Sequence, residues 1–327
     1  MTKPKVYITR LIPEAALEII AGACDYRIWP EEGTPVPRDI LLQEIPTVAG
    51  VFTLLTEKVD EELLRAAPRV KIVANMAVGY DNVDLAAASR HGVMVTNTPG
   101  VLTETTADLT FALLLATARR LLEANQYLRQ GRWKTWYPML LTGQDVYGAT
   151  LGIIGLGRIG EAVARRARGF AMRVLYYNRH RREDLERELG ATYRPLDDLL
   201  READFVSIHA PLAPETRHLI GERELALMKP TAVLINTSRG PLVDEQALYL
   251  ALVQKRIWAA GLDVFEAEPV SLENPLLRLE NVVALPHIGS ASVATRVKMA
   301  TTAAINLVAG VTGQRPPHLV NPQGWKG

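Results

Sequence analysis

The chain has 327 residues, 48% of them hydrophobic and 22% charged, a composition that excludes a disordered chain and a coiled coil. The formal net charge of +1 provides no overall positive field to attract nucleic acid or an anionic membrane. Cys24 is the only cysteine, which excludes an intrachain disulfide and a cysteine-based zinc site. The sequence lacks an apolar signal segment and any apolar run of ~20 residues, so we expect a cytoplasmic protein with no membrane span.

In the first part of the chain, short β-branched runs alternate with stretches rich in Ala, Leu, Glu and Arg. The predicted strands are 6–9, 50–53, 71–75 and 92–95. Alternation of this kind predicts a parallel sheet with helices on both faces. A predicted long helix, Thr103 to Leu122, follows Pro99-Gly100 and is interpreted as a crossing between two domains.

The segment Gly131–Gly143 has no clear hydrophobic period and concentrates aromatic residues. One interpretation is an irregular arm packed on its own domain. The other is a dimer contact whose tip reaches a neighbouring active site, and the enrichment of aromatics in protein interfaces favours it.

From Ala149 the alternation restarts. The predicted strands are 150–154, 174–177, 205–209, 232–236, 259–263 and 282–284. Six strands are the number in a complete dinucleotide-binding sheet. A last helix is predicted over Ser292–Gly310, and the tail after it is too short for a domain, so we expect it to dock on the first domain. The chain then crosses twice, near residues 99 and 288. We therefore expect a cofactor domain, 100–287 including the arm, inserted in a discontinuous substrate domain, 1–99 and 288–327.

A glycine-rich loop follows the strand at 150–154 in the pattern Gly-x-Gly-x-x-Gly. Gly155 would make the tight turn, Gly157 would let the backbone approach a pyrophosphate, and Gly160 would let helix and strand pack closely. The predicted helix Glu161–Arg168 would then offer its N-terminal N–H groups to the phosphates. A purely structural turn is the alternative, but the position between a strand and a helix favours dinucleotide binding.

The end of the next strand indicates which dinucleotide binds. Asn178 stands where an NAD-specific site has an acidic residue, and three arginines and a histidine follow it: Arg179, His180, Arg181 and Arg182. A carboxylate would repel a 2′-phosphate, whereas arginine binds it with paired hydrogen bonds. The sequence therefore predicts NADPH as cofactor, with NADH possible. In the alternative interpretation these arginines only solvate the start of a helix at Glu183.

No metal-ligand spacing, serine nucleophile elbow or Walker loop is present, so we expect no metal. Five of the six histidines are interpreted as surface or loop residues: His91, His180, His209, His218 and His318. His287 differs because it follows a strand, where ligands meet a doubly wound sheet. Arg239 and Glu268 also follow strands. An arginine, a carboxylate and a histidine at neighbouring strand ends predict a reductase, with Glu266 as a competing carboxylate.

Seven motifs in order make the chain resemble the D-isomer-specific 2-hydroxyacid dehydrogenases, and within them most closely the archaeal-type glyoxylate/hydroxypyruvate reductases. The motifs are Ala77–Asn82, Thr106–Asp108, Val146–Gly148, Gly155–Gly160, Asn236–Gly240, Gly261–Glu266 and Pro286–Ser290. The resemblance implies an α/β fold of two doubly wound parallel-sheet domains, with a Rossmann cofactor domain inserted in a flavodoxin-like substrate domain. It also implies a homodimer built on the cofactor domain.

The same resemblance assigns site roles. Arg239 would hold the carboxylate and carbonyl of a 2-oxo acid, and His287 would donate the proton to the carbonyl oxygen. Glu268, the second acid of its motif and therefore preferred to Glu266, would bind the imidazole and favour its protonated form. The backbone N–H groups of Val78 and Gly79 would bind the substrate carboxylate.

Cofactor contacts follow in the same way. The phosphates are expected to contact Leu156, Gly157, Arg158 and Ile159, and the 2′-phosphate is expected to contact Asn178, Arg179 and His180. The nicotinamide ribose is expected beside Thr237 and Ser238, and the carboxamide near Asp263. Gly289 would lie beside the catalytic histidine, and Thr106 would approach the nicotinamide from the other domain.

The expected activity is NADPH-preferring reduction of glyoxylate to glycolate and of hydroxypyruvate to D-glycerate. Two alternatives stay open: another D-2-hydroxyacid dehydrogenase of the D-lactate type, and a non-catalytic dinucleotide-sensing protein. Sequence does not rank substrates that differ by one hydroxymethyl group, because such a difference is worth only ~1 to 3 kcal/mol.

Overall fold

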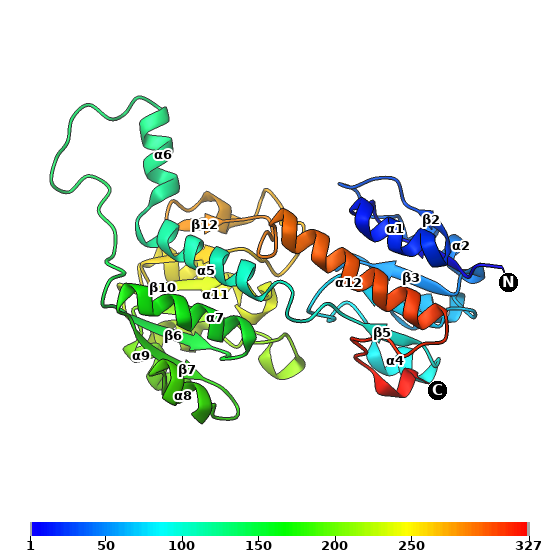
Figure 1. The fold of residues 1–327 in the computed structure, drawn as a ribbon. Helices are drawn as coiled ribbons and strands as arrows, with labels where there is room; N and C mark the ends of the chain where they lie inside the picture. The colour runs from blue at the N-terminus through cyan, green and yellow to red at the C-terminus, as the bar shows by residue number, and fades with distance from the viewer. Residues whose placement is uncertain (1, 326–327) are drawn as a thin grey trace. The chain divides into compact units, whose positions relative to one another are not determined.

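The computed structural model describes residues 2–325, and the chain divides into two compact units, each built on its own parallel sheet (Figure 1). Unit 1 is made from both ends of the chain, up to Leu102 and from Ala291 on, and unit 2 is Thr103–Ser290. The two sheets confirm the predicted fold class of two parallel α/β domains. None of the helices within residues 2–325 is long and apolar enough to cross a membrane.

The sheet of unit 1 has five parallel strands in the order β2-β1-β3-β4-β5, which is the flavodoxin-like order. The strands are β1 (Lys5–Ile8), β2 (Asp25–Ile28), β3 (Gly50–Thr53), β4 (Ile72–Asn75) and β5 (Met94–Thr96). β2 was not predicted from the sequence. It lies at the edge of the sheet and three of its four residues are exposed, so it lacks the buried β-branched pattern of its neighbours.

The helices of unit 1 cover this sheet. They are α1 (Glu14–Ala23), α2 (Arg38–Glu44), α3 (Glu61–Ala66), α4 (Leu85–Arg90) and α12 (Val293–Val311), with 3-10 turns at Ile45–Thr47 and Pro322–Gly324. A Cβ on Gly310 of α12 would lie 2.6 Å from Ile72, so glycine is what lets this helix lie close to the sheet. After α12 the tail returns to β5, where Asn321 accepts a hydrogen bond from the N–H of Val95.

The sheet of unit 2 has seven parallel strands in the order β12-β11-β10-β9-β6-β7-β8, which is the Rossmann order. The strands are β6 (Thr150–Ile154), β7 (Arg173–Tyr177), β8 (Thr192–Tyr193), β9 (Phe205–Ile208), β10 (Val233–Asn236), β11 (Ala259–Leu262) and β12 (Val282–Ala284). Six of them correspond to predicted strands. The seventh, β8, is a two-residue edge strand too short to produce a sequence pattern.

The helices of unit 2 are α5 (Thr103–Ala118), α6 (Leu121–Arg129), α7 (Arg158–Ala167), α8 (Glu183–Leu189), α9 (Leu196–Glu202), α10 (Glu222–Leu227) and α11 (Glu245–Val253), with 3-10 turns at Arg168–Phe170, Pro214–Thr216, Gly240–Leu242 and Pro275–Arg278. The prediction of one helix as far as Leu122 is wrong at its end. Arg120 adopts a left-handed backbone (φ 52°) and binds Glu123, so α5 stops at Ala118 and α6 begins in a new direction.

The segment after α6 leaves the body of unit 2 as a long loop (Figure 1). Residues 131–139 are exposed, among them Trp133, Trp136 and Met139, and α6 itself has no buried residue. The end of the arm contacts unit 2, where Gly143 lies against Ala118 and Arg120 donates to the carbonyl of Thr142. The exposure of residues 131–139 does not fit the interpretation of an arm packed along its length on its own domain.

Candidate active site

Arg239, Glu268 and His287 lie in the loops that follow β10, β11 and β12, at the carboxyl ends of the parallel strands of unit 2. His287 Nδ1 is 2.6 Å from Glu268 Oε2, and the N–H of Phe265 donates to Glu268 Oε1. Burial raises the pKa of Glu268, but the hydrogen bond and charge of His287, with a contribution from the charge of Arg239, outweigh burial and lower it overall. The structure thus brings the three predicted catalytic residues together.

The competing carboxylate takes no part in this pair. Glu266 Oε1 lies 2.9 Å from Nε2 of His218, a different histidine. The preference for Glu268 over Glu266 as the partner of His287 therefore agrees with the geometry.

The backbone of His287 is held in an uncommon conformation. Its φ of 54° lies in the left-handed region, which non-glycine residues adopt only where the surroundings impose it. The N–H of His287 donates to the carbonyl of Asp263, and the N–H of Ile288 donates to Asp263 Oδ1 at 2.8 Å. Asp263 is fully buried, so it fixes the position from which the imidazole projects.

Gly240 lets the turn that carries Arg239 pack against the loop that carries Glu268. A Cβ at position 240 would lie 1.8 Å from the carbonyl carbon of Phe265, which leaves no space for a side chain. The turn itself is tied by Asn236, whose side-chain amide donates to the carbonyl of Arg239. The close approach of these two backbones is what places an arginine beside the histidine–glutamate pair.

The glycine loop has the shape of a phosphate-binding turn. Gly155 has a φ of 99°, and a Cβ on Gly160 would lie 2.3 Å from the carbonyl oxygen of Gly155. Gly157 precedes α7 with no capping side chain, and a Cβ there would meet no atom within 4 Å. Arg158 and Ile159 are the first residues of α7, so their N–H groups have no partner within the helix and are suited to binding an anion.

Leu156, in the same loop, already has a hydrogen-bond partner for its backbone N–H. Its N–H donates to Asn178 Oδ1 at 2.6 Å, and its side chain is buried. The hydrogen bond ties the end of β7 to the glycine loop. Leu156 and Asn178 thus contact each other, and the N–H of Leu156 is already engaged.

Next to His287, Thr106, Asp263 and Gly289 lie together. A Cβ on Gly289 would be 3.2 Å from Asp263 Oδ2 and 3.6 Å from the methyl carbon of Thr106. Thr237 follows β10, and its hydroxyl is 2.8 Å from that of Thr110, one turn after Thr106 on α5. The prediction that Thr106 approaches from the other domain is wrong, because α5 belongs to unit 2.

Asp263 Oδ2 has no hydrogen-bond partner anywhere in residues 2–325 although it is buried. Burial raises the pKa of Asp263, opposed by the N–H of Ile288, the charge of His287 and the nearby N–H of Gly289. A buried acceptor without a partner is costly unless a ligand donates to it. The amide of a nicotinamide is a donor of that kind, so the residues present fit this cofactor.

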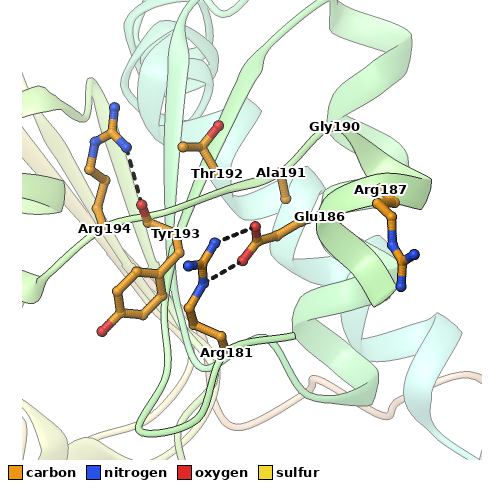
Figure 2. Close-up of a pocket in the computed structure, with 8 residues that line it drawn as sticks. All are labelled: Arg181, Glu186, Arg187, Gly190, Ala191, Thr192, Tyr193 and Arg194. Carbon is orange, nitrogen blue, oxygen red and sulfur yellow. Dashed lines mark hydrogen bonds and ion pairs between the residues drawn. The ribbon is translucent and has the colours of Figure 1, made fainter. Parts of the chain in front are cut away.

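The arginines after β7 divide into two groups. Arg181 binds Glu186 through two nitrogens, at 3.0 and 2.7 Å, and lies over the ring of Tyr193 beside a hollow of about 490 Å³ (Figure 2). Arg182 pairs with Asp184. These two arginines form ion pairs with residues of α8, and Arg181 also contacts the edge strand β8, as the alternative interpretation of arginines beside this helix expected. Arg179 and His180 are exposed.

Val78 and Gly79 lie in unit 1, in the loop after β4, whereas the other predicted site residues lie in unit 2. Asn97 donates to the carbonyl of Val78 at 2.8 Å, and Asn75 donates to the carbonyl of Gly79 at 3.1 Å. Within the described part of the chain, no group accepts from the N–H of Val78 or Gly79. The two asparagines, which sequence reasoning missed, hold the carbonyls while both N–H groups stay available.

His209 begins the loop after β9, but it is not a surface residue. Its Nε2 lies 2.8 Å from the hydroxyl of Ser207, which is fully buried, and its backbone touches the Gly155 turn. Burial lowers the pKa of His209 from 6.5 to about 4. The ring is therefore neutral beneath the glycine loop, and of the two interpretations, surface or loop, the loop position agrees with the structure.

We predict that this burial makes the protein less stable in mild acid. Between pH 6.5 and pH 4 the unfolded chain protonates His209 and the folded chain does not, so the free energy of unfolding falls by roughly 3 kcal/mol as the pH is lowered through this range. Urea unfolding should show a smaller fall for His209→Asn than for the wild type. His180→Asn, which removes an exposed histidine, is the matched control. An equal fall in all three proteins would contradict the prediction.

The sequence model described as "D-isomer specific 2-hydroxyacid dehydrogenase, NAD binding domain" matches residues 111–289. The chain is 54% identical over 322 residues to a glyoxylate reductase of Korarchaeum cryptofilum, covering 98% of this chain and 97% of that protein. The chain belongs to the D-isomer specific 2-hydroxyacid dehydrogenases. It is an NAD(P)-dependent oxidoreductase of that family.

A second relative and two solved structures are also similar to this chain over nearly its whole length. A glyoxylate reductase of Thermococcus gammatolerans is 53% identical, over 98% of this chain and 97% of that protein. An NADPH-dependent glyoxylate/hydroxypyruvate reductase of Sinorhizobium meliloti, solved with NADP and malonate, is 37% identical with a TM-score of 0.86, covering 99% of this chain and 98% of its own. A protein structure from Thermus thermophilus is 45% identical with a TM-score of 0.90, covering 97% of this chain and 99% of its own.

Proposed function

We propose that this dehydrogenase reduces small 2-oxo acids, glyoxylate to glycolate and hydroxypyruvate to D-glycerate, and prefers NADPH to NADH. The observation that carries the proposal is the 2.6 Å pair of His287 and Glu268 beside Arg239 at the carboxyl edge of the Rossmann sheet. The relatives named glyoxylate reductase and the NADPH-dependent glyoxylate/hydroxypyruvate reductase structure support the substrate class and the cofactor.

Unit 2 is the proposed cofactor domain. Arg158 and Ile159 would bind the phosphates through their N–H groups, and Gly157 would let the backbone approach them. Asp263 Oδ2 would accept from the carboxamide, with Thr106 and Gly289 against the ring and Thr237 and Ser238 at its ribose. When bound, the reduced nicotinamide supplies a hydride.

The three catalytic candidates have separate tasks. Arg239 would bind the substrate carboxylate and carbonyl through two nitrogens and so fix the carbonyl carbon in place. His287 would hold a proton on Nε2 and donate it to the carbonyl oxygen. Glu268 would accept from Nδ1–H, set the orientation of the ring and stabilise the imidazolium.

Unit 1 is the proposed substrate domain. The N–H groups of Val78 and Gly79 would bind the substrate carboxylate, because Asn97 and Asn75 hold the adjoining carbonyls. The proposed arrangement is the one expected from the sequence, a cofactor domain inserted in a discontinuous substrate domain.

The arm supports a proposed homodimer. Trp133, Trp136, Tyr137 and Met139 are all exposed on it. Large apolar side chains gathered on one exposed segment are typical of an interface between protein chains.

An NADPH oxidation assay tests the function and the cofactor together. We expect turnover of glyoxylate and hydroxypyruvate. The KM for NADPH should be at least about tenfold below that for NADH, because a tenfold ratio corresponds to about 1.4 kcal/mol, which charge-assisted hydrogen bonds to the 2′-phosphate can supply. Arg179→Ala should remove most of the preference and leave the KM for NADH unchanged. Arg187→Ala, an exposed arginine on α8, is the matched control.

Two results would contradict the proposal. Equal or tighter NADH binding by the wild type would exclude the NADPH preference. Tight dinucleotide binding without turnover of any 2-oxo acid would favour a dinucleotide-sensing protein.

A further inference from the structure

A second histidine–carboxylate pair lies beside the proposed catalytic residues and shares none of them. His218 Nε2 is 2.9 Å from Glu266 Oε1, and His218 Nδ1 is 3.8 Å from Asp244 Oδ2. His218 also has a left-handed backbone, with a φ of 52°. Its side chain and those of Glu266 and Asp244 are about one-third exposed, so the pair is neither a buried core contact nor a fully solvated one.

His218 contacts two of the three segments that carry catalytic candidates. Its backbone N–H donates at 2.8 Å to the carbonyl of Pro241, two residues after Arg239. Its imidazole binds Glu266, two residues before Glu268. One residue therefore ties the Arg239 turn to the Glu268 loop, at the place where Gly240 already brings the two backbones together.

Glu266 is held from a second side as well. The N–H of Glu245, at the start of α11, donates to Glu266 Oε1 at 3.2 Å, and Glu245 Oε1 accepts from the N–H of Glu266. Asn274 donates to the other carboxylate oxygen of Glu245 at 2.7 Å. The side chain and the backbone of Glu266 are both fixed, so the loop has little freedom at this point.

The contacts continue from Glu266 to the catalytic pair. The peptide unit that joins Phe265 to Glu266 lies against Gly240, and the N–H of Phe265 donates to Glu268 Oε1 at 3.0 Å. The other oxygen of Glu268 binds His287. Movement of the 265–266 backbone would therefore rotate the carboxylate that orients the imidazole.

We propose that His218 and Glu266 are positioning residues that hold Glu268 in the orientation in which it meets His287. This inference rests on the proposed catalytic roles of Glu268 and His287. Neither His218 nor Glu266 is assigned a contact with substrate or cofactor. A displacement near 1 Å can cost orders of magnitude in rate, so a loop held by a few hydrogen bonds is a sensitive point.

The test is a double-mutant cycle on kcat. His218→Ala should lower kcat roughly tenfold and leave the Kd for NADPH unchanged. The alkaline limb of its pH–rate profile should move to lower pH, because an imidazolium with a misplaced carboxylate loses its proton more readily. The double variant His218→Ala/Glu268→Gln should be no slower than Glu268→Gln alone, since His218 acts only through Glu268.

A comparison of two Glu266 variants keeps the inference testable if His218→Ala folds poorly. Glu266→Gln retains an oxygen that accepts from His218 and from the N–H of Glu245, so it should keep most of the activity that Glu266→Ala loses. His91→Ala is the matched control, because His91 also pairs with a glutamate, Glu61, at 3.0 Å, but on the surface of unit 1. It should leave kcat and the pH profile unchanged.

The outcomes separate this inference from the function on which it rests. Additive losses in the double variant, or an unmoved alkaline limb in His218→Ala, would overturn the positioning role alone. A Glu268→Gln variant with the kcat of the wild type would overturn the proposed catalytic pair and the inference with it.

Discussion

Replacement of His287 by Gln lowers the kcat for glyoxylate reduction by roughly 100- to 10,000-fold, the usual contribution of a positioned general acid. The Kd for NADPH is expected to stay unchanged, because no cofactor contact is assigned to the imidazole. The KM for glyoxylate should change little, since Gln keeps a hydrogen-bond donor for the carbonyl oxygen but has no proton to transfer. Steady-state kinetics together with a binding titration of NADPH measure these quantities.

The pH dependence gives this prediction a second readout. In the wild type the reduction rate should fall as the pH is raised, because general-acid catalysis requires a donor that carries its proton. In His287→Gln the residual rate should be nearly flat over the same range. His91→Gln is a control with an intact catalytic pair. A variant of His287 with near wild-type kcat would exclude it as the acid.

The parts of the fold that the sequence predicted are those with local causes. Strands of a parallel sheet are typically short runs of mostly apolar residues, and 50–53, 150–154 and 282–284 were predicted from such runs with the bounds that the structure shows. The edge strands β2 and β8 have one face open or too few residues, so neither produces a pattern. The turn at Arg120 has no glycine or proline to mark it, and only the ion pair with Glu123 shows why the helix stops there.

The candidate site likewise contains residues that the sequence could predict and contacts that it could not. Arg239 and His287 could be chosen because each follows a strand, and parallel strands have their carboxyl ends on the same side of the sheet. Strand position left Glu266 and Glu268 as alternatives, and the resemblance to the family decided between them. The pairing of His218 with Glu266 joins residues 48 positions apart through a left-handed backbone, and no sequence period indicates it. The bond between the N–H of Leu156 and Asn178 also depends on the register of β6 and β7. Contacts set by tertiary structure were thus the ones that sequence reasoning missed.

Replacement of Arg239 by Lys is expected to lower kcat/KM for glyoxylate by about 100-fold, or ~2.7 kcal/mol, with the Kd for NADPH unchanged. Lysine retains the positive charge that acts on Glu268 but has no planar pair of donors for a carboxylate and a carbonyl together. Most of the loss should fall on kcat, because a substrate held by one contact is bound but poorly oriented. Arg187→Lys on α8 is the matched control.

Chemical rescue of Arg239→Ala distinguishes a role of Arg239 in orienting the substrate from a role of its positive charge alone. Added guanidinium should restore part of the activity of Arg239→Ala, because the planar cation can occupy the space beside Glu268 and bind the substrate through two donors. An alkylammonium ion of similar size should restore less. If Arg239→Lys kept wild-type kcat/KM, or if both cations rescued Arg239→Ala equally, a positive charge alone would suffice. The close packing of Gly240 against Phe265, which holds the arginine at its place beside His287, would then serve the fold rather than the reaction.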